Sequence, residues 1–262
     1  MRGRVFLVGA GPGDPELLTL KAAKVLAAAE VVLYDSLVSQ EVLALVSSEA
    51  LLLDVGKRAG KKLLTQDEIN DLMLSYARQQ RLVVRLKGGD PLLFGRAGEE
   101  MESLRRAGVD FEIVPGITAA VGAAAAAKIT LTDRRVASQV LFTTYSRERA
   151  GWLNWAAVTP ETTIAIYMPG IHYGEVGARL MENGLAGETP CVVASLATRA
   201  EQQMSWSTIA ALSDEDQLPA PSLLLVGRVA SQKPRGWSGR LHTALFRLNE
   251  RRELEPPAKW SQ

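Results

Sequence analysis

The stretch VFLVGAGPGDPELLTL, residues 5–20, contains an apolar strand, a glycine-rich turn and the start of a helix. A dinucleotide-binding fingerprint has the same order of elements but needs glycines spaced G-x-G-x-x-G, and here Asp14 stands at the third position. Asp14 followed by Pro15 predicts a helix N-cap and a first helical residue. Because a carboxylate at this place would repel a phosphate, the turn predicts a ligand that is not recognised through phosphate.

Apolar runs and helical patterns alternate through the first half of the chain. Strands are expected at VFLVG, VVLY, LLLDV, LVVRL and FEIV, and helices at 15–29, 39–46, 65–80 and 96–107. The helix from 65 has the clearest start, because Thr65 and Glu68 fit a capping box. This alternation predicts a parallel α/β sheet.

The pattern changes after VPGITAA, residues 114–120. Helices are expected at 117–127 and 171–183, and strands near 138–144 and in TTIAIYM, PCVVASL, EQQMSWST and SLLLVG. Because neighbouring strands are here joined by few residues, this half predicts a mixed sheet. We divide the chain into an N-terminal α/β domain (1–115), a C-terminal α/β domain (116–230) and a basic tail (231–262).

The tail differs from the rest of the chain in being rich in Arg, Trp and Pro. Within it Leu241, Leu245 and Leu248 recur at helical spacing, which predicts a short amphipathic helix. That helix would dock on the rest of the chain or on a partner, and we favour the first.

Composition limits the classes of function. The 262 residues are 47% hydrophobic with a formal net charge of +1, which argues against a broad nucleic-acid surface. The single cysteine, Cys191, excludes an internal disulfide, and two histidines leave no zinc-type cluster, so we expect no metal. No apolar run approaches the ~18 residues that span a bilayer. We expect a cytoplasmic protein that binds no membrane.

Four unusual stretches stand where the predicted strands end: GAGPGDP (9–15), YDSLV (34–38), RLKGGDPLLFGRAGEE (85–100) and VPGITAA (114–120). Open α/β sheets hold their ligands at this edge. Gly88 and Gly89 would allow a ligand close to the backbone, and Asp90 before Pro91 is expected to direct its carboxylate into the opening. A simple turn is the alternative for this last motif.

These motifs, with VGKRAGK (55–61) and TQDEIN (65–70) in the same order, resemble the uroporphyrinogen-III C-methyltransferases of the tetrapyrrole methylase family. The resemblance covers residues 3–230 and weakens after 135. It implies two α/β domains with S-adenosylmethionine (SAM) in the cleft between them and a homodimeric enzyme. The implied reaction methylates two pyrrole carbons of uroporphyrinogen III to give precorrin-2 and S-adenosylhomocysteine, on the routes to sirohaem, cobalamin and haem d1. SAM carries no phosphate, which agrees with the first turn.

The resemblance also implies roles for individual residues. Residues that bind SAM would be Pro12, Gly88, Gly89, Asp90, Leu93, Thr118, Ala119, Met168 and Ala197. Met168 has a plainer interpretation as core filler at a strand end. The implied proton acceptor is Asp35 and the implied proton donor is Lys57, whose alternatives are a helix cap and a solvated surface lysine.

Uroporphyrinogen is rich in carboxylates, so its site should contain arginines that bind in bidentate geometry. Arg96 and Arg134 are the candidates for substrate binding, and Arg96 is also placed with the catalytic residues. A cation is unfavourable at a helix start, which favours a functional interpretation of Arg96. The same helix start accounts for Glu99 and Glu100.

The chain departs from the family pattern at several positions. Asp133 replaces the histidine of the usual LTHR, Tyr145 and Ser146 stand where TGH is common, Ala197 replaces a glycine, and Ser36 replaces a frequent arginine. One alternative is therefore a catalytically weak homologue that binds SAM or a porphyrinoid. Another is a methylase of a different precorrin; a methylase of ribosomal RNA is disfavoured by the charge.

Overall fold

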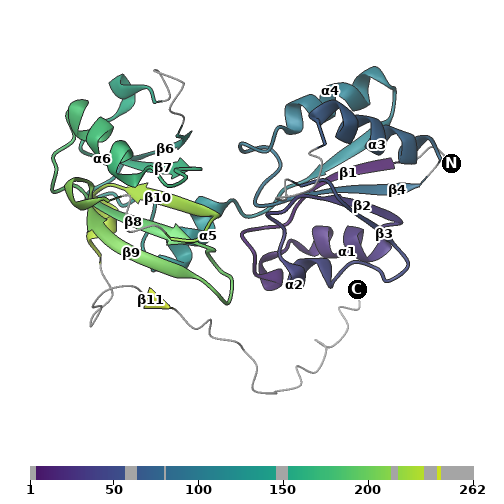
Figure 1. Cartoon of the computed structure of the whole chain (residues 1–262), viewed down its shortest axis with the longest axis horizontal. Coiled ribbons are helices and arrows are strands. Elements are labelled where there is room, and N and C mark those ends of the chain that lie inside the picture. The colour runs from purple at the N-terminus through teal and green to yellow at the C-terminus, as the bar shows by residue number, and fades with distance from the viewer. Residues whose placement is uncertain are drawn as a thin grey trace, which may run out of the picture.

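The structure, a computed structural model, describes residues 4–56, 64–79, 81–145, 153–213, 218–232 and 241–242. Two sheets lie side by side, each with helices against it (Figure 1). The predicted α/β class with two sheets is confirmed. We call β1 to β5 with α1 to α4 the N-terminal lobe, and the elements from α5 to β11 the C-terminal lobe.

The N-terminal lobe is built on a five-stranded parallel sheet of order β3-β2-β4-β1-β5. Its strands are β1 (Arg4–Gly9), β2 (Val31–Tyr34), β3 (Leu51–Asp54), β4 (Leu82–Lys87) and β5 (Asp110–Val114). Helices α1 (Leu20–Ala28) and α2 (Gln40–Leu43) cover one face, and α3 (Gln66–Arg78) and α4 (Ala97–Arg106) cover the other (Figure 1). The central strands are therefore buried on both faces, as a parallel sheet requires.

Local sequence signals account for the starts of these helices. Thr65 and Glu68 form the predicted capping box of α3. The helix expected over 15–29 is instead interrupted: a short 3₁₀ turn, η1 (Pro15–Leu17), is capped by Asp14, and α1 begins after Thr19. The Thr19 hydroxyl accepts a hydrogen bond from Ala22 N at 3.1 Å, so a second N-cap restarts the helix.

The C-terminal lobe contains a six-stranded mixed sheet of order β11-β9-β8-β10-β7-β6, which confirms the predicted mixed sheet. Its strands are β6 (Gln139–Thr144), β7 (Thr162–Tyr167), β8 (Pro190–Ser195), β9 (Gln203–Thr208), β10 (Ser222–Val226) and β11 (Leu241–His242). Only β6 and β7 pair in parallel. Helix α5 (Ala119–Ala127) packs on one face and α6 (Tyr173–Glu182) on the other. The described part of the lobe also contains short 3₁₀ turns: η2 (Trp155–Ala157), η3 (Ile209–Ala211) and η5 (Arg228–Ser231).

The tail begins differently from the prediction. Leu241, expected in an amphipathic helix, lies in β11 and pairs with Met204 of β9. Pairing with β9 therefore gives Leu241 an extended conformation, although the spacing of the leucines favours a helix. Leu245 and Leu248 lie outside the described residues.

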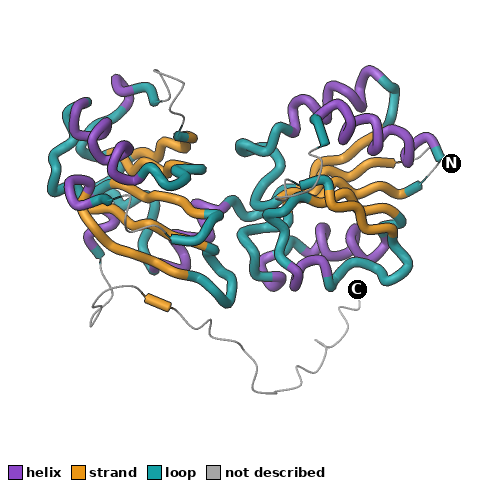
Figure 2. Tube along the Cα trace, viewed as in Figure 1, coloured by secondary structure: helices purple, strands orange, loops and turns teal. Residues whose placement is uncertain are grey.

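The carboxyl ends of the parallel strands point toward the C-terminal lobe, and the loops that follow them gather between the two sheets (Figure 2). Between β5 and α5 the chain passes from one lobe to the other through residues 115–118. Among the described residues, no helix combines the length and apolar character needed to cross a bilayer.

Candidate functional site

Glycines bring the loops after β1, β4 and β5 into backbone contact. Gly11 and Gly89 exchange hydrogen bonds, with Gly11 N donating to Gly89 O at 3.1 Å and Gly89 N donating to Gly11 O at 2.8 Å. A Cβ on Gly9 would lie 2.6 Å from Gly116 N, so no larger residue fits there. Gly89 has φ +68°, a conformation that favours glycine. The backbone groups of Gly89, which we expected to face a ligand, thus join two loops of the sheet edge.

Asp90 connects the β4 loop to the β5 loop. Its Oδ2 accepts a hydrogen bond from Gly116 N at 2.9 Å, and its Oδ1 accepts one from Leu92 N at 2.8 Å. The sequence predicts a carboxylate directed into the opening, and in the structure both of its oxygens also accept hydrogen bonds from backbone N–H groups. Each oxygen keeps a second lone pair, so the carboxylate still offers negative charge to a cation.

The start of α5 lies against the end of β7. The Tyr167 hydroxyl lies 2.6 Å from Thr118 Oγ1 and accepts a hydrogen bond from Ala120 N at 3.2 Å. Burial raises the pKa of Tyr167, so the phenol stays protonated near neutral pH. Gly89 lies next to this helix start, since a Cβ on it would be 3.7 Å from Ala119 N. Thr118 and Ala119 therefore adjoin the β4 loop.

Met168 follows Tyr167 in an unusual conformation. Its φ is +53° and it is 60% exposed, so the structure excludes the interpretation as core filler. A non-glycine residue with positive φ is uncommon, and such strained positions cluster at functional sites. Phe94, at φ +55° and 42% exposed, packs against Tyr167 with the two rings tilted and their centroids 5.0 Å apart. Phe94 of the N-terminal lobe thus contacts Tyr167 of the C-terminal lobe, which precedes the exposed Met168 in the chain.

Pro12 and Ala197 come to the same region from opposite lobes. The Pro12 ring packs on α5 at Gly122. A Cβ on Gly122 would lie only 2.7 Å from the Pro12 ring. Ala197 lies between Leu196 and Thr198, which have φ +49° and +68°. Of the expected SAM-binding residues, Leu93 is half-buried in the β4 loop. All of these residues belong to loops that contact one another.

Asp35 lies at the end of β2, half-buried, and its Oδ1 accepts a hydrogen bond from Leu37 N at 3.0 Å. It does not cap α2, because Ser39 occupies the N-cap. Leu37 packs over Gly88, where a Cβ would lie 2.6 Å from the Leu37 Cβ. Asp35 is therefore beside the β4 loop. Lys57 lies outside the described residues.

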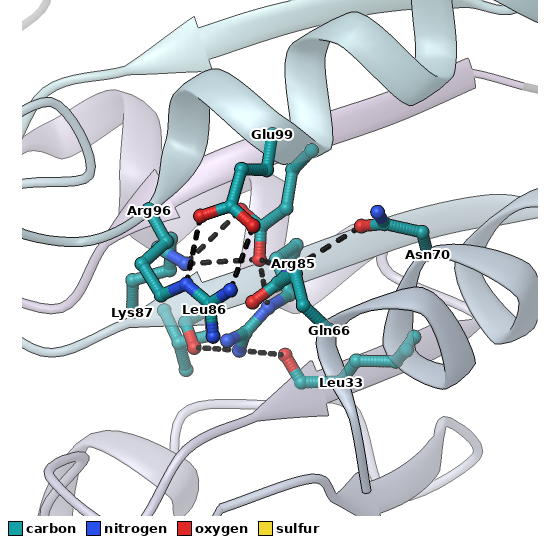
Figure 3. Close-up of polar contacts among 9 residues, drawn as sticks. Leu33, Gln66, Asn70, Arg85, Leu86, Lys87, Arg96 and Glu99 are labelled. Carbon is teal, nitrogen blue, oxygen red and sulfur yellow. Dashed lines mark hydrogen bonds and ion pairs between the residues drawn. The ribbon is translucent and has the colours of Figure 1, made fainter.

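Arg96 is the N-cap of α4 in the left-handed conformation and is 59% exposed at its side chain. Its guanidinium binds Glu99 with both prongs, Nε to Oε1 at 2.8 Å and Nη2 to Oε2 at 2.7 Å (Figure 3). This bond raises the pKa of Arg96 and lowers that of Glu99. Arg134 is exposed and forms no ion pair with the residues that the structure describes. Nothing ties it to the glycine loops.

Glu100 belongs to a buried ion cluster that the sequence interpretation missed. It has no exposed surface, and its Oε1 accepts hydrogen bonds from Arg85 Nε and Lys87 Nζ, both at 2.9 Å. Gln66 of α3 donates to the same oxygen at 3.4 Å. Figure 3 shows Arg85 and Lys87 extending from β4 beneath the start of α4. Two basic residues at alternating positions of a strand buried on both faces could have revealed the cluster, because buried charges need partners.

The cluster also has electrostatic consequences at the end of β4. Burial lowers the pKa of Lys87 and Arg85 lowers it further, whereas Glu100 acts in the opposite direction. Lys87 O accepts the hydrogen bond of Ala10 N at 2.7 Å, so the same residue supports the first glycine turn. The cluster thus fixes the strand end from which the β4 loop begins.

Two positions where the chain departs from the family pattern are enclosed by local contacts. Asp133 accepts hydrogen bonds from Arg135 Nε at 2.9 Å, Nη2 at 2.6 Å and N at 2.9 Å, which lower its pKa to about 2. Tyr145 is buried beside His172, with ring centroids 6.1 Å apart. Ser146 lies outside the described residues. The carboxylate of Asp133 is therefore bound by Arg135 within the same turn.

The arrangement limits the chemistry of the site. The described residues include no group of three or more His, Cys, Asp or Glu side chains placed to hold a metal ion. What the structure brings together instead is glycine backbone, the start of α5 and the carboxylate of Asp90, with Asp35 linked to the β4 loop through Leu37 and the exposed Met168 following Tyr167. These groups could hold a partly apolar organic cation at the edge of the first sheet.

Comparison with known proteins identifies related chains. The sequence profile of the Tetrapyrrole (Corrin/Porphyrin) Methylases matches residues 4–213. A siroheme synthase of Photorhabdus laumondii is 46% identical over 233 residues, which are 88% of this chain and 50% of the relative. A chloroplastic SAM-dependent uroporphyrinogen III methyltransferase of Arabidopsis thaliana is 44% identical over 239 residues, 88% of this chain and 65% of the relative. This chain therefore spans between half and two thirds of the length of these curated relatives.

Solved structures agree with the sequence comparison. The uroporphyrin-III C-methyltransferase of Thermus thermophilus, in complex with S-adenosylhomocysteine, superposes with a TM-score of 0.75 at 36% identity. The match covers 87% of this chain and 99% of that chain. The two-lobed architecture described above is thus shared over almost the full length of that structure.

Proposed function

We propose a function from one premise: this chain belongs to the tetrapyrrole (corrin/porphyrin) methylases. It methylates two pyrrole carbons of uroporphyrinogen III, with SAM as methyl donor, to give precorrin-2. The observation that carries this proposal is the meeting of the glycine loops of the first sheet with Thr118 at the start of α5, where Tyr167, the residue before Met168, contacts Thr118. The similarity to the Arabidopsis methyltransferase and to the Thermus structure with bound S-adenosylhomocysteine supports both donor and substrate.

The residues present fit SAM. We assign it to Pro12, Gly88, Gly89, Asp90, Leu93, Thr118, Ala119, Met168 and Ala197, which lie on the strand-end loops and at the start of α5. Asp90 offers negative charge to a cationic ligand, and Met168, exposed at φ +53°, offers an apolar side chain. The strain at Met168 supports a role in binding, because nothing in core packing requires it.

When bound, SAM supplies the electrophilic methyl group, and the chain has to orient the substrate and handle protons. Asp35 is the proposed proton acceptor. The Leu37 N–H fixes the direction of Oδ1, and the lone pairs that remain on the carboxylate can take a proton. Lys57 is the proposed donor. Phe94 and Met168 present apolar surface to the macrocycle.

Arg96 and Arg134 are the proposed partners of the substrate carboxylates. Arg134 has no partner to give up among the described residues. Arg96 is bound to Glu99 on both prongs and would have to exchange that carboxylate for one of the substrate. The Arg96–Glu99 pair is exposed at the surface, so the exchange costs little. We also propose that the chain acts as a homodimer, as the resemblance implies.

The test is direct. Purified protein is incubated without oxygen with SAM and enzymatically made uroporphyrinogen III, and mass spectrometry counts the methyl groups added. A doubly methylated product supports the proposal. Binding of SAM without methyl transfer supports instead the catalytically weak homologue. That alternative is favoured by Asp133 and Arg96, because Arg135 and Glu99 already bind their side chains. Transfer to another precorrin in place of uroporphyrinogen III identifies a methylase of different specificity.

A further inference from the structure

The loop between β8 and β9, residues 196–202, crosses from the C-terminal lobe to the glycine turn after β1. Thr198 Oγ1 accepts a hydrogen bond from Asp14 N at 3.1 Å. Inside the loop, Thr198 N donates to Gln202 Oε1 at 2.7 Å, and Gln202 is only 1% exposed. Thr198 itself has φ +68°. A loop that is strained and anchored in this way has a defined conformation where the lobes meet.

Arg199 extends from this loop between two loops of the N-terminal lobe. Its Nη2 donates a hydrogen bond to Leu37 O. Its aliphatic part lies over Gly13, where a Cβ would be 2.6 Å from the Arg199 Cγ. Gly13 is in turn tied to the second loop, because Ser39 Oγ donates to Gly13 O at 2.6 Å. The absence of a side chain at Gly13 is thus what admits Arg199.

Leu37 links Arg199 to Asp35. The carbonyl of Leu37 accepts from Arg199, and its N–H donates to Asp35 Oδ1 at 3.0 Å. One residue of backbone therefore separates the guanidinium of one lobe from the carboxylate of the other. A shift of Arg199 would be transmitted to the direction of that carboxylate.

The electrostatic surroundings show that Arg199 is held at a cost. Its Nε is buried without a hydrogen-bond partner among the described residues, and burial lowers the pKa of Arg199. Three nearby carboxylates raise the pKa of Arg199: Glu41 of α2, Glu201 of its own loop and Asp35. Asp35 also raises the pKa of Lys87. An arginine keeps its charge nonetheless. A buried donor without a partner is unfavourable, so stability alone does not explain this contact.

We propose that Arg199 is a positioning residue for Asp35: through the backbone of Leu37 it holds the Asp35–Val38 loop against the glycine turn, and it keeps a positive charge beside the carboxylate. The inference rests on the proposed function for its catalytic meaning. Arg199 itself touches neither donor nor substrate in this assignment.

The test compares Arg199→Met with Arg106→Met, since Arg106 is an exposed arginine in the last turn of α4. We expect Arg199→Met to lower kcat between about 10-fold and 100-fold, the size of effect that a small misplacement of a catalytic group produces. Affinity for S-adenosylhomocysteine, measured by calorimetry, should change less than about threefold. The acidic limb of the kcat profile should move to higher pH, because loss of a nearby cation disfavours an ionised carboxylate.

Two further variants separate positioning from folding. Arg199→Lys keeps the charge and a donor for Leu37 O, so it should leave the acidic limb in place and recover part of kcat. Arg199→Gln keeps a donor for Leu37 O but loses the charge, so it should move the acidic limb of the kcat profile to higher pH. This variant tests the charge even if Arg199→Met does not fold. In the Asp35→Asn background, Arg199→Met should have a much smaller effect than alone, because the two residues act as a unit.

A readout without catalysis completes the test. Hydrogen–deuterium exchange in the segment Asp35–Val38 should rise in Arg199→Met and stay unchanged in Arg106→Met. Equal kcat, pH profile and exchange in the two variants would overturn the inference. A fall in donor affinity as large as the fall in kcat would also overturn it, since that shows a general loss of structure. If the wild type transfers no methyl group, the proposed function fails. The exchange measurement still tests whether Arg199 holds the Asp35–Val38 loop in place.

Discussion

Lys87 Nζ donates hydrogen bonds to both carboxylate oxygens of Glu100, at 2.9 and 3.0 Å, and neither side chain is more than 4% exposed. Arg85 shares one of these oxygens, so a single carboxylate is the ionic partner of two buried cations. Removal of the carboxylate leaves both cations buried without their anionic partner, and among the described residues Arg85 keeps only its hydrogen bonds to Leu33 O and Leu86 O. This is far more costly than loss of a surface ion pair.

Glu100→Ala is therefore expected to destabilise the fold by about 3–5 kcal/mol, measured as the free energy of unfolding in urea. Glu99→Ala is the matched control, because Glu99 precedes it on the same helix and is 51% exposed, and it should cost less than about 1 kcal/mol. If both variants unfold at the same urea concentration, the cluster contributes nothing to stability.

The pKa of Asp133, about 2, gives a prediction about pH. Its usual value is 3.8, and the hydrogen bonds from Arg135 are the main cause of the decrease. Since the pKa is lower in the folded state, this contact stabilises the fold above about pH 4 and is lost as pH falls toward 2. In Arg135→Met the carboxyl titration, followed by NMR, should return toward 3.8. A midpoint that stays near 2 would assign the decrease to another group.

Met168 should contribute to donor binding and not to stability. Met168→Ala is expected to weaken binding of S-adenosylhomocysteine about tenfold or more, equivalent to about 1.4 kcal/mol, with little change in Tm. Met204→Ala is the control, because Met204 is 1% exposed in the core of the C-terminal lobe. It should cost about 2–5 kcal/mol of folding stability. Isothermal calorimetry and thermal unfolding measure the two effects, and a stable Met168 variant with unchanged affinity removes Met168 from the site.

The sequence predicted the sheet edge well for a physical reason. Each strand-end motif combines a short apolar run with glycine, proline or aspartate, and these residues restrict the local backbone whatever lies around them. Asp14, Pro15, Thr65 and Glu68 accordingly act as expected. Thr19 is an equally local signal, and recognising it as a second cap would have divided the first helix correctly.

The contacts that were missed depend on distant residues. The sequence pattern explains Glu100 by the helix dipole, because a carboxylate is common in a first turn. Only the packing of α4 on β4 shows that it faces Arg85 and Lys87. Arg199 was not singled out at all, since its partner Leu37 lies 162 residues away in the chain. Such pairings follow from topology, and no local pattern encodes them.

Arg96 should act on substrate affinity. Arg96→Met removes a bidentate partner for a carboxylate, worth about 1.5–3 kcal/mol, so KM for uroporphyrinogen III should rise about 10-fold to 100-fold. Arg96→Lys keeps the charge but not the fork and should recover only part of the affinity. Arg105→Met, on the exposed side of α4, is the control. Steady-state kinetics at two salt concentrations measure these effects; a KM equal to that of the control would leave Arg134 as the remaining candidate.

Asp35→Asn separates proton transfer from binding. The amide keeps an oxygen that can accept the Leu37 N–H bond, so the loop and its packing over Gly88 should persist. It cannot take a proton, and the contribution of a general base is about 100-fold to 10,000-fold. Turnover should therefore fall by about that factor while affinity for S-adenosylhomocysteine stays within about threefold. Asp54→Asn, at the end of the neighbouring β3, tests whether loss of any carboxylate at this edge has the same effect. Because only Asp35 adjoins the β4 loop through Leu37 and Gly88, turnover of the Asp54 variant should exceed that of the Asp35 variant, and equal turnover would exclude Asp35 as the proton acceptor.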